Sequence, residues 1–163
     1  QFGTELHLGL KETSIKMNKI ISSKAMDKND SGYKKEDYKI SEELISVLDV
    51  WNDANNRDIE SLKSAHFNSP RFSKFGPRVS ERQNVDETNS SESEHFSSIK
   101  DVDLKMDDLK IDIFDNVGVV TFYNNYSFIK NSKSVNGKGR VTLVFYNTHD
   151  GWKIVHEHSS SFN

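Results

Sequence analysis

Two histidines near the C-terminus, His156 and His158, are the residues whose type and spacing point most directly to chemistry. One residue separates them in a β-like stretch, so on a strand both imidazoles lie on the same face. Such a pair can transfer protons near neutral pH or supply half of a transition-metal site. His156 and His158 are therefore the candidate catalytic residues.

A metal site would need a third ligand, and the sequence around the histidine pair offers none. His66, on the apolar face of a predicted helix, could supply it. Histidines that form hydrogen bonds in a core or a pocket explain the pair without a metal, and this interpretation is favoured. No cofactor is expected; acid–base chemistry and a site made of His66, His156 and His158 stay open as alternatives.

A β-hairpin is predicted to position the two histidines. The dipeptide Asp150-Gly151 is typical of a two-residue hairpin turn, and a turn there would pair Phe145 with His156. One face of the hairpin then collects Val141, Leu143, Phe145, Trp152, Ile154, His156 and His158. The opposite face carries Arg140, Thr142, Val144, Tyr146, Lys153, Val155 and Glu157.

The rest of the second half is also rich in strands. Leu109, Ile111 and Ile113 alternate with polar residues, and residues 117–129 form a long β-branched and aromatic run. Two faces of that run are possible, and the favoured inner one carries Val120, Phe122, Asn124, Tyr126 and Phe128.

Helices are predicted in the first half of the chain. A helix over residues 41–55 has an apolar stripe that includes Leu44, Leu48 and Trp51, and a second, shorter helix follows Asp58. A loop with two prolines, residues 68–78, ends this half. Residues 80–98 begin with a possible capping box and read equally as a third helix or a loop.

Composition limits the class of protein. The chain has 163 residues with 34% hydrophobic and 29% charged residues, which fits one folded domain. Its net charge of -3 argues against a nucleic-acid binder. No apolar run is long enough to span a membrane, and the absence of cysteine excludes disulfides and thiolate chemistry.

The chain divides into an arm and a domain. Residues 1–36 carry seven lysines against five acidic residues and are predicted to be an N-terminal arm, which could dock a partner, whereas residues 37–163 form the domain. A cytoplasmic location is expected. The chain starts at Gln1, so a cleaved leader stays open.

The C-terminal sequence Asp150-Gly151-Trp152-Lys153-Ile154-Val155-His156-Glu157-His158 resembles the last strand of SnoaL-like domains in the nuclear transport factor 2-like superfamily. The resemblance extends back to the helix pair of residues 42–67. It implies an α+β fold in which a cone-shaped, curved antiparallel sheet wraps around N-terminal helices. A pocket between the sheet and the helices is a further implication.

Functions in this superfamily differ, so the resemblance does not fix one. Members include ketosteroid isomerase, polyketide cyclases, dehydratases and a kinase association domain. The isomerase base belongs near the loop after the second helix, yet residues 65–79 contain no Asp or Glu. We therefore expect a pocket for a small apolar or amphipathic ligand without isomerase chemistry, or an association domain. The alternative is an isomerase, cyclase or hydrolase that uses pocket histidines as acid and base.

The fold and the hairpin register together predict the pocket and the dimer face. The expected pocket residues are Trp51, His66, Tyr126, Leu143, Phe145, His156 and His158. On the outer face, Val144, Tyr146 and Val155 are too apolar for a fully wetted sheet. A homodimer through this face is therefore expected.

Overall fold

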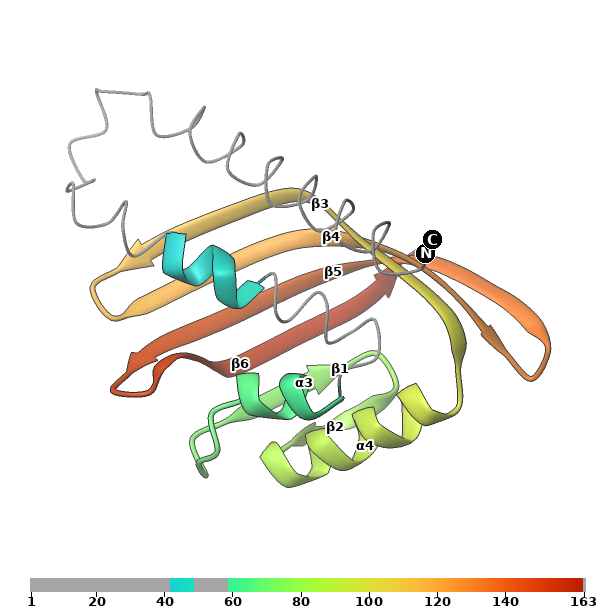
Figure 1. Cartoon of the computed structure of the whole chain (residues 1–163), viewed down its shortest axis with the longest axis horizontal. Coiled ribbons are helices and arrows are strands. Elements are labelled where there is room, and N and C mark those ends of the chain that lie inside the picture. The colour runs from blue at the N-terminus through green and yellow to red at the C-terminus, as the bar shows by residue number, and fades with distance from the viewer. Residues whose placement is uncertain (1–41, 49–58, 163) are drawn as a thin grey trace, which may run out of the picture.

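The computed structural model describes residues 42–48 and 59–162 (Figure 1). Residues 42–48 are helical, and the later residues form two helices and six strands. In chain order these are α3 (Ile59–Ala65), β1 (Ser73–Gly76), β2 (Val79–Gln83), α4 (Val85–Ser97), β3 (Lys100–Phe114), β4 (Val117–Lys130), β5 (Lys133–Thr148) and β6 (Gly151–Phe162). No helix in these two ranges is long and apolar enough to cross a membrane.

All six strands belong to one sheet with the order β2-β1-β6-β5-β4-β3. Neighbouring strands are antiparallel except β1 and β6, which are parallel. The long strands curve, and α3 and α4 lie together beside the short strands at one edge (Figure 1). The predicted α+β fold with a curved, mainly antiparallel sheet is confirmed.

The core lies on the concave face of the sheet. Leu143, Phe145 and Ile154 are fully buried there, together with Leu44 and Leu48 of the helical residues 42–48. On β4, Val120 and Phe122 are buried whereas Tyr123 is 42% exposed, so the favoured inner face of this strand is confirmed. Trp51 and the arm of residues 1–36 lie outside the described residues.

The third helix exists, but it begins later than its predicted cap. The N-cap is Asn84, whose Oδ1 accepts a hydrogen bond from Glu87 N at 3.0 Å while Glu87 Oε2 accepts one from Asn84 N at 2.8 Å. This reciprocal pair is a capping box, but it lies four residues after the one that the sequence predicts at Ser80 and Gln83. Those two residues instead lie in β2, so the predicted cap position is wrong.

The loop predicted between residues 68 and 78 contains a short strand. Residues of β1 pair with β6 in the order Ser73 with His156, Lys74 with Glu157 and Phe75 with His158. Four residues are too few to show a period of two, and a parallel partner far along the chain leaves no local signal. The sequence therefore could not identify this strand.

The hairpin of β5 and β6 has a different register from the predicted one. Thr148 pairs with Gly151, so the turn is His149-Asp150 rather than Asp150-Gly151. This change alone moves each pairing by two residues and leaves the faces unchanged. Further along, Phe145 pairs with Ile154 but Val144 pairs with His156, so Val155 is an extra residue in a β-bulge.

The bulge exchanges the two faces of β6 beyond Val155. Glu157 is buried, whereas His156 is half-buried and His158 is exposed. Their partners on β5, Val144 and Thr142, belong to the outer face. The prediction that both imidazoles face inward and Glu157 outward is therefore wrong.

Candidate functional site

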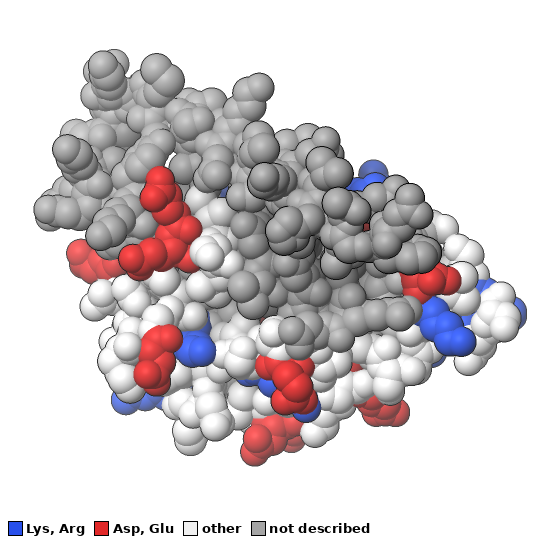
Figure 2. Space-filling view, viewed as in Figure 1, with Lys and Arg blue, Asp and Glu red and all other residues white. Residues whose placement is uncertain are grey.

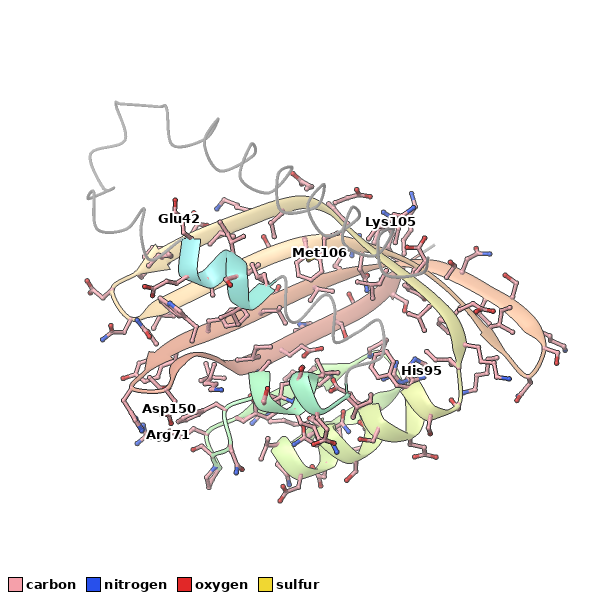
Figure 3. All side chains as sticks on the ribbon, in the orientation of Figure 1. Glu42, Arg71, His95, Lys105, Met106 and Asp150 are labelled. Carbon is pink, nitrogen blue, oxygen red and sulfur yellow. The ribbon has the colours of Figure 1, made fainter. Side chains whose placement is uncertain are left out.

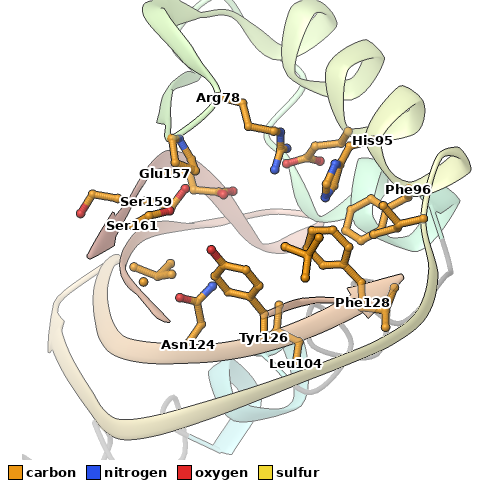
Figure 4. A pocket seen from close by; sticks show the side chains of 18 of the residues that line it. Arg78, His95, Phe96, Leu104, Asn124, Tyr126, Phe128, Glu157, Ser159 and Ser161 are labelled. Carbon is orange, nitrogen blue, oxygen red and sulfur yellow. The ribbon is translucent and has the colours of Figure 1, made fainter. Parts of the chain in front are cut away.

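A cavity of about 260 Å³ lies between α4 and the concave face of the sheet (Figure 4). It is lined by residues of every strand from β3 to β6, by α4 and by the segment around β1. The lining residues are Lys74, Pro77, Arg78, Glu92, His95, Phe96, Ile99, Val102, Leu104, Asn124, Tyr126, Phe128, Val135, Gly139, Val141, Glu157, Ser159, Ser160 and Ser161.

The wall of the cavity is mainly aliphatic and aromatic. The rings of Tyr126 and Phe128 are stacked, with centroids 6.0 Å apart and an angle of 14° between planes. A Cβ atom at Gly137 would lie 2.5 Å from the Tyr126 hydroxyl, and one at Gly139 would overlap Asn124 Oδ1. The two glycines of β5 therefore let the side chains of Tyr126 and Asn124 on β4 lie close to the β5 backbone.

The inner end of the cavity contains a buried lysine between two carboxylates. Lys74 Nζ binds Glu157 Oε1 at 2.7 Å and also forms an ion pair with Glu92 Oε1. Lys74 comes from β1, Glu157 from the neighbouring β6 and Glu92 from α4, which packs against β1. Because the bulge in β6 turns Glu157 inward, it places this carboxylate opposite the ammonium group.

His66 lies behind this ion pair. Its Nδ1 atom is 2.9 Å from Asn89 Oδ1, and its Nε2 atom is 3.9 Å from Glu92 Oε2 and 3.8 Å from Glu157 Oε2. These last three atoms are buried and make no hydrogen bond to the described residues. We call the four residues His66, Lys74, Glu92 and Glu157 the inner charge cluster.

The inner charge cluster shifts the proton affinities of its members. Burial alone would favour neutral forms, but the carboxylates of Glu157 and Glu92 raise the pKa values of both His66 and Lys74 above their ordinary values. Burial likewise opposes the charge on Glu157, yet the ammonium of Lys74 and the nearby His66 hold its pKa well below the usual range. The two carboxylates therefore stabilise the charged form of Lys74 and make His66 easier to protonate.

The cluster also has a donor set that could hold a metal ion. His66, Glu92 and Glu157 each offer one atom, and these atoms lie within 4.8 Å of one another. A divalent ion at their centre would, however, share both carboxylates with the ammonium of Lys74, and the repulsion between two neighbouring buried cations is strong. The cluster is better described as an ion-pair network centred on Lys74 than as a metal centre.

The other end of the cavity contains two basic side chains without such partners. Figure 4 shows the side chains of Arg78 and His95 pointing into the cavity. Within residues 42–48 and 59–162, neither the guanidinium of Arg78 nor a ring nitrogen of His95 has a hydrogen-bond or ion-pair partner. The imidazole of His95 instead contacts the rings of Phe96 and Phe128, with centroids 5.5 and 5.6 Å away.

The surroundings of His95 favour its neutral form. Partial burial lowers its pKa, and the positive charges of Arg78, Lys130 and Lys74 lower it further, to about 4. At neutral pH this imidazole is therefore uncharged, with one nitrogen able to donate a hydrogen bond and the other able to accept one.

Of the predicted pocket residues, Tyr126 lines the cavity. Leu143 and Phe145 are fully buried core residues, and His66 lies behind the lining in the inner charge cluster. His156 and His158 lie on the outer face, where Ser73 Oγ is 2.8 Å from His156 Nδ1 and the ring of Phe75 contacts both imidazoles. His66 is grouped with Glu92 and Glu157 rather than with these two histidines.

The sequence analysis did not predict five charged or titratable residues that line the cavity: Lys74, Arg78, Glu92, His95 and Glu157. For Glu92 and His95 the sequence does contain a pattern that could have identified them. Glu92, His95 and Phe96 have the spacing i, i+3, i+4, so on a helix they share one face. Lys74 and Glu157 depend on the parallel strand and on the bulge, which no local pattern marks.

The comparisons with known proteins agree with this fold. Residues 45–163 match the family described as SnoaL-like domain. Since the match covers most of the chain, the protein belongs to the SnoaL-like domain family. No curated protein matches the chain.

Solved structures of distant relatives share the fold. A candidate dehydratase of the nuclear transport factor 2-like family from Streptomyces avermitilis has a TM-score of 0.68 at 17% identity, covering 76% of this chain and 97% of that one. A superfamily protein from Salmonella enterica serovar Typhimurium has a TM-score of 0.69 at 20% identity, covering 77% and 92%. A candidate calcium/calmodulin-dependent protein kinase II association domain from Xanthomonas campestris has a TM-score of 0.63 at 17% identity, covering 74% and 86%.

Proposed function

We propose that this SnoaL-like domain binds a small amphipathic molecule in the cavity between α4 and the sheet. The observation that supports the proposal best is the cavity itself, with an aromatic and aliphatic wall and polar groups at its ends. Pockets for drug-sized ligands have volumes of roughly 300–1,000 Å³. A cavity of about 260 Å³ therefore suits a ligand below that size.

Proton abstraction of the ketosteroid isomerase kind is not part of the proposal. A carboxylate base in an apolar site needs a pKa close to neutral. The described carboxylates that line the cavity, Glu92 and Glu157, are both bound to Lys74, and the pKa of Glu157 is lowered rather than raised. Both groups are therefore better suited to holding Lys74 than to removing a proton.

Native mass spectrometry and ligand-observed NMR with a library of small amphipathic compounds test this proposal. Val135 lines the cavity and Val144 lies on the outer face of the same strand, so the same substitution can be made at both. Val135→Phe should fill the cavity and abolish binding, and Val144→Phe should leave binding unchanged. A library with no binder, or binding that survives in Val135→Phe, would contradict a ligand in this cavity.

Assembly into a homodimer through the outer sheet face is the second part of the proposal. Tyr123 of β4 and Tyr146 of β5 are 42% and 41% exposed on this face, and Val144 of β5 pairs with Val119 of β4. Two of the structural neighbours, including the Xanthomonas campestris protein, are described as association domains.

Light scattering after size exclusion tests the dimer. Val144→Glu places a charge in the centre of the outer face and should convert a dimer into a monomer of 18.7 kDa. Ser90→Glu, at an exposed position of α4, should not change the mass of the assembly. A wild-type protein that is monomeric at micromolar concentration would show that the face has another role.

An isomerase, cyclase or hydrolase that uses a pocket histidine is the second candidate function. His156 and His158 were the residues predicted for this role, and their position on the outer face gives that assignment no support. His95 lines the cavity instead, and its low pKa makes it a better hydrogen-bond donor than a base at neutral pH. Turnover of a bound compound that is lost in His95→Gln, while binding persists, would favour the enzyme.

A further inference from the structure

The charged side chains that line the cavity are unevenly paired. Glu92 and Glu157 both form ion pairs with Lys74, and neither forms one with Arg78. Arg78 then adds one positive charge at the cavity, with Lys130 near enough to act on His95. Among the described residues, the guanidinium of Arg78 is therefore the lining charge without an ion-pair partner, and it makes this end of the cavity locally positive.

Arg78 is available to a ligand. It follows β1 in the Pro77-Arg78 turn, its residue surface is exposed, and its side chain points into the cavity (Figure 4). No other described side chain neutralises its guanidinium. A planar guanidinium with free N–H groups binds carboxylates through two parallel hydrogen bonds.

His95 provides a second donor beside the guanidinium. Figure 3 places it on α4, on the side that faces the sheet. Its ring nitrogens have no hydrogen-bond partner in the described part of the chain, and the positive charges of Arg78, Lys130 and Lys74 act on it. An anion at this place would gain a hydrogen bond from the imidazole and a charge-assisted bond from Arg78.

The apolar wall begins next to these two donors. The rings of Phe96 and Phe128 contact His95, and the wall continues through Leu104, Val135 and Val141. A ligand whose head reaches Arg78 and His95 therefore places its remaining atoms against apolar surface.

We propose that the cavity selects small amphipathic carboxylates, whose anionic head is bound by Arg78 and His95 and whose apolar part lies against Phe96, Phe128 and the sheet. This inference rests on the proposed small-molecule binding and names its ligand class. A cationic ligand fits less well, because Lys74 already occupies the two lining carboxylates.

Matched probe pairs separate this inference from the function on which it rests. Ligand-observed NMR and calorimetry at pH 7 compare phenylacetate with phenylacetamide, and hexanoate with hexanamide, on the full chain. Each carboxylate should bind about tenfold more tightly than its amide, the size of one charge-assisted hydrogen bond. Carboxylates and amides that bind equally would overturn the anion selectivity and leave small-molecule binding intact, whereas failure of all four probes would overturn both.

Variants locate the selectivity. Arg78→Gln should remove the preference for the carboxylate, Arg78→Lys should keep part of it, and His95→Gln, which keeps a donor, should weaken it less than Arg78→Gln. Arg71→Gln is the matched control, because Arg71 is exposed and lies far from His95 in Figure 3. Circular dichroism melting confirms that each variant is folded. A preference that survives in Arg78→Gln, or disappears in Arg71→Gln, would overturn the assignment of Arg78.

Discussion

The two ends of the cavity use charge in opposite ways. At the inner end, Lys74 and His66 are buried and face the carboxylates of Glu92 and Glu157. At the other end, Arg78 and His95 face the cavity without a described partner. On the side of the molecule that Figure 2 shows, where the helices lie, acidic and basic side chains of the described residues are interspersed.

This difference separates structural from functional charge. Burying a charge costs free energy, so a buried charged side chain needs an ion-pair partner. Removing one member of such a pair leaves the other buried without a counter-charge, which is strongly destabilising. An unpaired cation at a cavity keeps its binding capacity for a ligand. The inner charge cluster should therefore determine stability, while Arg78 and His95 should determine binding.

The largest effect is expected from removing the central cation of the cluster. Lys74→Met leaves two carboxylates buried without their ammonium partner and should lower the free energy of unfolding by about 3 to 5 kcal/mol in urea. Lys63→Met is the control, since Lys63 pairs with Glu60 at the surface, 2.9 Å away, and should cost about 0 to 1 kcal/mol. Equal losses in the two variants would contradict a structural role for the cluster.

Acid should weaken the cluster through Glu157. Its pKa is lowered from 4.5 to about 2, so its stabilisation is complete above pH 4.5 and is lost as the pH falls towards 2, about 3 kcal/mol in total. His66 has a raised pKa, so its contribution is complete below pH 6.5 and is lost as the pH rises through the folded value.

Urea unfolding at a series of pH values measures both limbs of this dependence. Glu157→Gln, compared with the wild type, should flatten the acid limb specifically. If the acid limbs of the two proteins are parallel, other carboxylates cause the loss and Glu157 is not the coupled group.

A smaller loss of stability is expected from adding a Cβ atom at Gly137, beside the ring of Tyr126. Gly137→Ala forces the Tyr126 ring away from β5 and should cost about 1 to 3 kcal/mol while altering the binding of any cavity ligand. At Gly76 a Cβ atom would be 3.5 Å from Lys74 Cε, an ordinary contact, so Gly76→Ala is the milder control. Unchanged stability and binding in Gly137→Ala would mean that Tyr126 does not depend on this glycine.

The smallest effect on stability is expected at Arg78. Because its guanidinium is unpaired among the described residues, Arg78→Gln should change the free energy of unfolding by no more than about 0.5 kcal/mol. Urea unfolding beside the Lys74→Met variant gives the direct contrast. A loss of several kcal/mol would place Arg78 in the structural network and remove the distinction between the two ends.

Local periodicity was sufficient to predict much of the fold. Alternation along β4 identified the inner face with Val120 and Phe122, and the apolar spacing identified Leu44 and Leu48 as core residues. These predictions succeeded because a period of two or 3.6 residues directly reports which side of an element is buried. The strand β1 was missed because its pairing depends on β6, far along the chain.

The candidate site was harder to predict, because one extra residue in β6 determines which of its later side chains face the cavity. With strict alternation His156 and His158 would face inward, but the bulge at Val155 puts Glu157 there and turns the histidines outward. The charge of Lys74 on the neighbouring strand is what makes a buried Glu157 tolerable, and this long-range partner is not visible in the local sequence.

A histidine NMR titration tests the contrast between the two ends most directly. Ring resonances of His66 and His95, assigned with His66→Gln and His95→Gln, are followed against pH in one sample of the full chain. His66, beside the carboxylates, should titrate above 6.5. His95, which is partly buried and near the positive charges of Arg78, Lys130 and Lys74, should titrate near 4. A His66 that titrates below 6.5, or a His95 that titrates at or above it, would contradict the division into a paired inner cluster and an unpaired positive end.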